Sequence, residues 1–164
     1  MTCSLRSWWS VAALAAVVMM VAGGCSNNSE AASSSTPTAS IFVQNFKYNG
    51  VPSTLPTGVI VQLLFQNKES FPITPEMIPV ALPEGKSAQD VINDAKAKGP
   101  DSEDDWLHIG GDFGAVDTGA GIVETLVLPP GNYVFACWQT GTQTPGKEGP
   151  PHAAKGMVSE FTVS

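Results

Sequence analysis

Three residues in the last third of the chain carry side chains that bind soft metal ions. Cys137, His152 and Met157 follow one another with fourteen and then four residues between them. A cysteine thiolate, an imidazole and a thioether together form a donor set that suits copper. The sequence therefore predicts a candidate copper site at Cys137, His152 and Met157. His108 and Met77 are weaker candidates, because a histidine or methionine among apolar residues more often packs in the interior.

The three candidate ligands belong to one strand–loop–strand unit. Residues 132–137 and 157–163 are predicted strands, and the loop 138–156 joins them. In the first strand Tyr133, Phe135 and Cys137 share one face, which suits burial. A loop of nineteen residues can bring His152 back to Cys137, but we expect it not to hold the imidazole rigidly.

The preceding residues are predicted to form further strands. Residues 59–65 alternate strictly, with every second side chain apolar and inward. Residues 41–48 are predicted as a first strand with Phe42, Phe46 and Tyr48 on one buried face. Residues 76–82 and 122–128 are the remaining predicted strands.

One helix interrupts the strands. Ser87 is a suitable N-cap with Asp90 three residues later, and Gly99-Pro100 ends the helical pattern. A single helix among strands is expected to lie across one end of the domain. Six or seven strands with one short inserted helix favour an all-β fold, a Greek-key β-sandwich.

Two segments resemble the cupredoxin family of blue-copper-type proteins. They are residues 128–137, LPPGNYVFAC, and residues 151–157, PHAAKGM. The resemblance covers nearly all of 41–164 and is most specific in the C-terminal third. It implies a cupredoxin-like Greek-key β-sandwich. Cupredoxins take a first histidine ligand from an early strand, and the corresponding place here is 74–77. Pro75 stands there and has no ligand atom, so the copper-ligand set is incomplete.

The beginning of the chain has the features of a bacterial export signal. Arg6 precedes an apolar stretch, 8–22, which has the proportions of a signal sequence. The residues Ala-Gly-Gly before Cys25 resemble the cleavage site of lipoprotein signal peptidase. That resemblance implies cleavage before Cys25 and a lipid anchor, with palmitate-type acyl chains, on its sulfur. An ordinary secretory signal and an uncleaved anchor are the alternatives.

These features divide the chain into three parts: a signal peptide at 1–24, a lipidated flexible tether at 25–40, and a cupredoxin-like domain at 41–164. The tether is rich in Ser, Thr and Asn and has little with which to form a core. The predicted location is outside the cytoplasm, with the protein attached to the cell membrane through its lipid.

Charge excludes one class of partner. The chain has 15 acidic and 8 basic residues and a net charge of −7, whereas a nucleic-acid binder needs a basic surface. No polybasic segment adds to the lipid, so the lipid alone is expected to attach the protein to the membrane. The sequence does not identify a protein partner.

Two functions are consistent with these residues. After export and lipidation Cys137 has no disulfide partner in its own chain, so it is expected to be buried, metal-bound or reactive. The first hypothesis is a copper protein for carriage or electron transfer, with Cu(I) favoured by few soft donors. The alternative is a metal-free structural or protein-interaction module at the cell surface. No enzyme is predicted, because there is no G-x-S-x-G motif and no evident third group to orient a Cys137–His152 pair.

Overall fold

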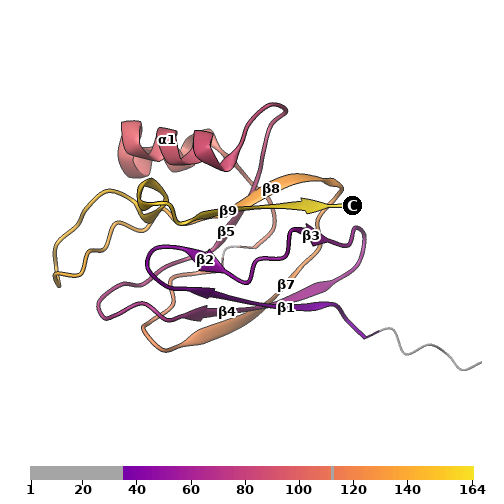
Figure 1. Ribbon diagram of the computed structural model, residues 1–164, viewed down its shortest axis with the longest axis horizontal. Coiled ribbons are helices and arrows are strands. Elements are labelled where there is room, and N and C mark those ends of the chain that lie inside the picture. The colour runs from indigo at the N-terminus through magenta and orange to yellow at the C-terminus, as the bar shows by residue number, and fades with distance from the viewer. Residues whose placement is uncertain (1–34, 112) are drawn as a thin grey trace, which may run out of the picture. The chain divides into compact units, whose positions relative to one another are not determined.

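The computed structural model describes residues 35–111 and 113–164. These residues form two β-sheets packed face to face, with one α-helix (Figure 1). The predicted all-β sandwich with a short inserted helix is therefore confirmed. Within the described residues, no helix is long and apolar enough to cross a bilayer. The predicted signal peptide at 1–24 and the predicted lipid site at Cys25 lie outside them.

The first sheet has the strand order β2-β1-β4-β7. Its strands are β1 (Thr38–Val43), β2 (Tyr48–Asn49), β4 (Val61–Asn67) and β7 (Gly121–Leu126). β1 and β4 run parallel, and β7 runs antiparallel to β4. The alternation of 59–65 is confirmed from Val61 onwards, because Val61, Leu63 and Phe65 are all buried.

The second sheet has the strand order β3-β9-β8-β5-β6. Its strands are β3 (Thr54–Leu55), β5 (Ile78–Ala81), β6 (Leu107–His108), β8 (Gly131–Ala136) and β9 (Val158–Val163). β8 pairs antiparallel with both β5 and β9. The inner side chains of both sheets form one apolar core, in which Phe135 stacks on Phe161 with ring centroids 4.5 Å apart.

The first predicted strand, 41–48, is wrong in its extent and in its buried face. β1 ends at Val43, and Asn45 and Phe46 have φ of 56° and 53°, which turns the chain towards β2. That turn breaks the two-residue period on which the prediction rested. The residues of β1 that enter the core are Ile41 and Val43, while Phe42 lies on the other face. Tyr48 is buried as predicted, but it belongs to β2.

β1 also begins earlier than the predicted domain boundary. Thr38 to Ser40 pair with Gln62 to Leu64 of β4. The last three residues of the predicted tether at 25–40 therefore belong to the sheet, because their backbone groups are satisfied by a neighbouring strand despite their polar side chains.

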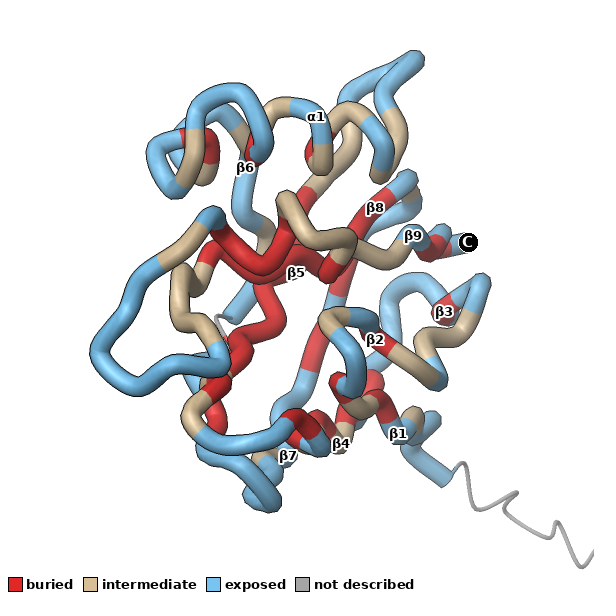
Figure 2. The backbone as a smooth tube through the Cα atoms, turned by 60° about the vertical axis from the view of Figure 1, so that its left-hand side comes forward, coloured by how far each residue is buried: buried red, intermediate tan, exposed pale blue. Residues whose placement is uncertain are grey.

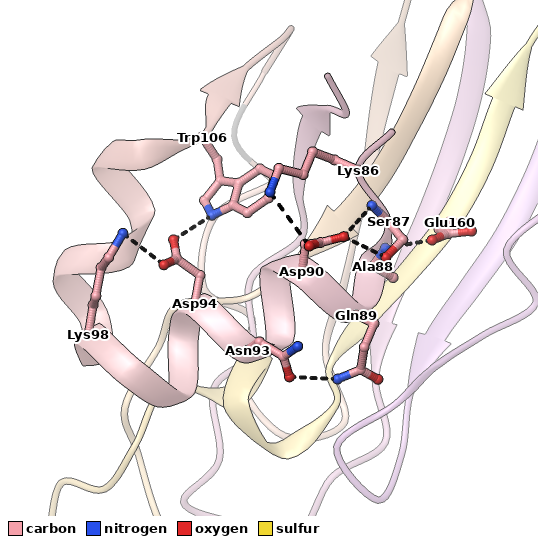
Figure 3. A network of polar contacts seen from close by, with 10 residues as sticks. All are labelled: Lys86, Ser87, Ala88, Gln89, Asp90, Asn93, Asp94, Lys98, Trp106 and Glu160. Atoms are coloured by element: carbon pink, nitrogen blue, oxygen red, sulfur yellow. Dashed lines mark hydrogen bonds and ion pairs between the residues drawn. The ribbon is translucent and has the colours of Figure 1, made fainter. Parts of the chain in front are cut away.

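The helix α1 (Ala88–Lys98) begins and ends where the sequence predicts. The Ser87 backbone N–H donates to the Asp90 carboxylate at 2.9 Å, as a capping box requires. Lys98 pairs with Asp94 at 2.8 Å. Figure 3 shows this network, in which the Trp106 indole also donates to Asp94 and the backbone N–H of Ala88 donates to Glu160 of β9.

The expected position of the helix, across one end of the domain, is wrong. α1 covers the outer face of the second sheet, where Val91 packs with Val80 and Val134. The outward side chains of β5 and β8 are apolar, so they are stabilised by burial. The apolar face of α1 packs on them and excludes water. The buried strands beneath a partly exposed helix are visible in Figure 2.

Candidate metal centre

Cys137 directly follows β8 and points into the core. The strand alternation places it on the inner face with Phe135, and its side chain has no solvent exposure. The Glu76 backbone N–H donates to its sulfur at 3.5 Å. Burial first, and the Glu76 carboxylate second, raise the pKa of the Cys137 thiol well above its ordinary value. The metal-free side chain is therefore a protonated thiol.

His152 starts the 3₁₀ helix η2 (His152–Lys155) and faces Cys137. Its Nδ1 lies 3.3 Å from the Cys137 sulfur, and its Nε2 lies 2.9 Å from the Gly141 carbonyl oxygen. A carbonyl oxygen only accepts, so Nε2 carries the proton and Nδ1 has a free lone pair. The imidazole is fully buried, and burial lowers its pKa, which keeps it neutral.

The long loop between these two residues is folded, so the expectation that it would hold His152 loosely is wrong. The His152 backbone N–H donates to the Gln139 carbonyl at 2.9 Å, and the Ala153 N–H donates to the Cys137 carbonyl at 2.7 Å. These bonds close the chain next to the site, and the remaining residues form a hairpin with a Gly141–Glu148 bridge. Most of the fourteen residues between Cys137 and His152 therefore form this hairpin, and only the hydrogen-bonded residues at its base connect the two candidate ligands.

Met157 comes next to His152 through a tight turn. Gly156 has φ of 101°, a conformation that suits glycine. The turn lets the Met157 N–H donate to the His152 carbonyl at 3.0 Å. The thioether is fully buried in the same apolar cluster as Cys137.

The opposite wall of the site is the segment 74–77. Pro75 is buried there and has no side-chain donor atom. Glu76 fastens this segment to the Cys137 strand, because its carboxylate accepts from the Trp138 N–H at 2.7 Å and from the Gln139 amide at 2.7 Å. Both carboxylate oxygens are thus directed at the loop rather than at the sulfur.

Sequence reasoning missed Glu76, Gly141 and Phe46. One sequence feature could have pointed to Glu76, because it is an acidic residue among apolar residues and stands next to Pro75. Gly141 acts through its backbone carbonyl, for which the sequence has no signal. Phe46 packs edge-on against the His152 ring with centroids 5.1 Å apart, and Lys155 Nζ lies 4.2 Å from the Phe46 centroid on this wall.

Of the two weaker candidates, His108 lies away from Cys137 and His152, whereas Met77 packs in the same buried cluster as Cys137. His108 lies on β6 and stacks on Trp138 with centroids 5.6 Å apart. Trp138 follows Cys137 and packs beneath α1, on the opposite face of the sheet. Met77 is fully buried in the core and its backbone pairs with Phe113. Its packing is that of a core residue.

Two strong donors and one buried thioether therefore gather at this end of the sandwich. The described part of the chain holds no group of three or more His, Cys, Asp and Glu side chains that could bind an ion. Zinc bonds thiolate sulfur at about 2.3 Å and imidazole nitrogen at about 2.0 Å, and two such bonds at the tetrahedral angle place the donor atoms about 3.5 Å apart. The observed separation of 3.3 Å is close to the spacing of two ligands on one transition-metal ion.

The comparisons with known proteins agree with this architecture. No protein-family model matches the sequence, and no curated protein matches it significantly. Among solved structures, the dithionite-reduced auracyanin of Roseiflexus castenholzii is 26% identical, with a TM-score of 0.53, and the match covers 79% of this chain and 98% of that one.

A second similar structure is auracyanin A of Chloroflexus aurantiacus, described as a "blue" copper protein. It is 18% identical, with a TM-score of 0.50, and the match covers 79% of this chain and 100% of that one. At that identity the likeness concerns the fold alone. The strand order, the position of the Cys137–His152 pair and these likenesses together show that the chain contains a cupredoxin-like domain.

Proposed function

We propose that this domain binds copper, as Cu(I), through Cys137 and His152, with Met157 as a weak third ligand. The observation that carries the proposal is the 3.3 Å approach of His152 Nδ1 to the Cys137 sulfur, with the other ring nitrogen bound to Gly141. The two donor atoms need little rearrangement to share one ion. A small set of soft donors without a second imidazole favours Cu(I) over Cu(II).

The residues of the site have separate tasks in this proposal. Bound copper would supply a one-electron couple, or simply a cargo for carriage. Cys137 has to lose its proton to bind, and because its pKa is raised, binding should strengthen as the pH rises. Gly141 fixes the ring so that Nδ1 faces the sulfur. The Glu76 N–H remains available to the thiolate.

Binding rather than catalysis is part of the same proposal. Gly141 does supply the orienting group that a Cys137–His152 nucleophile pair would need. However, Cys137 and His152 have no solvent exposure, so a substrate has no path to the sulfur in this conformation. An enclosed thiol–imidazole pair suits an ion better than a molecule.

A copper titration of the purified full chain tests the proposal. With reduced thiol and one equivalent of Cu(I), the chain should retain the ion against a competing chelator. His152→Gln should weaken retention by at least about tenfold, and Cys137→Ser by more. His108→Gln is the matched control, since His108 lies on the other face of the sheet, and it should change nothing. A chain that keeps no copper would contradict the proposal.

The lack of a ligand atom at Pro75 supports a second function, a metal-free structural or interaction module at the cell surface. A thiol that donates to a neutral imidazole satisfies both groups without a metal. In that case Cys137→Ser, which keeps a donor, should leave stability nearly unchanged. The wild-type chain should then not be stabilised by Cu(I), whereas a copper protein should unfold at a higher temperature with the ion.

We also propose that the protein is exported and is attached to the cell membrane through a lipid on Cys25. The support is the sequence before Cys25 and the polar segment that separates it from β1. Cys25→Ser should release the protein from the membrane fraction, and labelled palmitate should no longer be incorporated. Cys137→Ser is the matched control, because Cys137 is buried, and it should leave both readouts unchanged.

A further inference from the structure

One end of the sandwich carries an exposed apolar group where the chain enters the domain. We call Val59, Ile60 and Val127 the entry-end patch. Their side chains are 42%, 55% and 55% exposed. In the register of the first sheet Val61 faces Leu126, so Ile60 and Val127, the residues just beyond the ends of β4 and β7, lie side by side. Val59 adjoins Ile60 in the chain, so the three exposed apolar residues are grouped at one end of the sandwich.

This surface lies beside the first strand of the described chain. Thr38 of β1 pairs with Gln62 of β4, and the Gln62 N–H donates to the Pro37 carbonyl at 2.9 Å. The chain that precedes β1 thus arrives within a few residues of Ile60. Figure 1 shows the described chain starting at the end opposite the hairpin of residues 139–149.

The patch and the candidate metal centre occupy opposite ends of the sandwich. Phe46, which touches His152, follows the far end of β1, whereas Thr38 starts the strand at the entry end. Six residues of strand separate the two ends by roughly 20 Å. A contact made by the entry-end patch therefore leaves the opposite end of the sandwich, beside the metal centre, uncovered.

Charge is absent from the first-sheet segments at this end, whereas Glu84 and Lys86, in the loop after β5, lie at the same end of the second sheet. Residues 35–46, 48–67 and 125–146 contain no Asp, Glu, Lys or Arg, in a chain with 15 acids and 8 bases. An anionic lipid surface repels the acidic faces of such a protein but not an uncharged apolar one. The first-sheet side of the entry end is thus the side that can approach a bilayer.

We infer that the entry-end patch docks on the lipid surface to which Cys25 anchors the protein, and that this contact turns the metal centre away from the membrane. The inference rests on the lipid anchor of the proposed function and not on copper binding. Three partly exposed side chains bind lipid weakly by themselves. Twelve residues separate Cys25 from Thr38, and a polar linker of that length would span roughly 20 Å. Such tethering gives an effective concentration of about 1 mM, at which a weak contact is populated.

Quenching by brominated lipids tests the inference. The full chain is anchored in vesicles of equal parts phosphatidylglycerol and phosphatidylethanolamine with brominated acyl chains, without copper. A tryptophan introduced by Val127→Trp should lose emission by about twofold relative to unbrominated vesicles, as an interfacial side chain does. Phe71→Trp is the matched control, since Phe71 is 75% exposed and follows the far end of β4, and its added emission should not change.

A second pair of variants breaks the contact. Ile60→Asp in the Val127→Trp chain should restore the emission, whereas Phe71→Asp in the same chain should not. If vesicle-bound Val127→Trp is unquenched, or if both added tryptophans are quenched alike, the docking is wrong while the anchor stands. If the chain does not sediment with vesicles, the anchor and the docking both fail. A separate Cu(I) titration of the same sample reports on the metal proposal alone.

Discussion

The two walls of the candidate metal centre differ in what they contribute. The C-terminal wall, from Cys137 to Met157, supplies every proposed donor atom. It holds the imidazole by two hydrogen bonds, to the Cys137 sulfur and the Gly141 carbonyl, and the His152 backbone by a third, to the Gln139 carbonyl. The N-terminal wall, 74–77, supplies packing, one N–H to the sulfur and a carboxylate that fastens the walls together. Its one position expected to bear a ligand holds Pro75.

The contrast shows that the frame of a metal centre and its ligand set are separable. The Glu76 N–H reaches the Cys137 sulfur although the residue before it has no donor atom. By the frame we mean the backbone and packing that surround the candidate ligands. It depends on backbone hydrogen bonds and buried side chains, and these remain in place although position 75 is a proline and not a histidine. The ligand count then sets which oxidation state the frame prefers.

Restoring a donor at the N-terminal wall should have the largest effect. Pro75→His adds an imidazole next to Glu76, so affinity for Cu(II) should rise by about a hundredfold. A strong visible thiolate-to-copper absorption should appear, and spectroscopy with a Cu(II) titration measures both. Pro75→Leu, which adds no donor, is the control and should remain colourless. A colourless Pro75→His chain that folds normally would show that position 75 does not face the sulfur.

Removing the support behind the N-terminal wall should cost stability instead. Asn67 is buried, and its amide donates to the Ile73 and Val116 carbonyls at 2.7 and 2.8 Å while its oxygen accepts from the Glu69 N–H. Val116 in turn donates to Pro75. Asn67→Ala leaves three polar groups unpaired and should lower the free energy of unfolding by about 3 kcal/mol.

Urea denaturation of the purified chain measures this loss. Gln66→Ala, on the opposite face of β4, is the control and should stay within about 0.5 kcal/mol of wild type. A similar loss in both variants would mean that β4 itself, rather than the Asn67 network, sets the stability of this wall.

The two walls also differ in how far the sequence predicts them. Cys137 and His152 lie in one local unit, so their meeting follows from two strands and a loop. Ser87 and Asp90 predict a helix start because capping involves neighbouring residues. Glu76 and Gly141 act across long separations or through backbone atoms, and side-chain patterns do not encode such contacts. Phe46 was misplaced for a related reason, since a positive φ interrupts the alternation.

The buried donors should make stability depend on pH in both directions. Burial lowers the pKa of His152 below its ordinary 6.5, so below that pH the unfolded chain takes up a proton that the folded chain refuses. Burial raises the pKa of Cys137 above its ordinary 9.0, so above that pH the unfolded chain alone loses a proton. Each group should reduce stability by at most about 1.4 kcal/mol per pH unit in its range.

Metal-free stability should therefore be greatest between these two values, and urea denaturation at acidic, neutral and alkaline pH measures it. Cys137→Ser should flatten the alkaline side only, and His152→Gln the acidic side only. If either variant leaves its own side unchanged, other groups control the titration there.

The smallest expected effect concerns the hairpin that carries Gly141. The Thr142 hydroxyl is placed to donate to the Lys147 carbonyl at 3.0 Å or the Thr144 carbonyl at 3.2 Å, and it accepts from the Thr144 N–H at 3.2 Å. Thr142→Val keeps the shape and removes these bonds, so the free energy of unfolding should fall by only about 0.5–1 kcal/mol. The Gly141 carbonyl would then hold His152 less firmly, and Cu(I) should leave about two- to tenfold faster. Thr144→Val is the control, because its own hydroxyl makes no hydrogen bond in the described structure. Stopped-flow transfer of Cu(I) to a chelator measures the rates, and equal rates in Thr142→Val and wild type would place the control of release in η2 rather than in the hairpin.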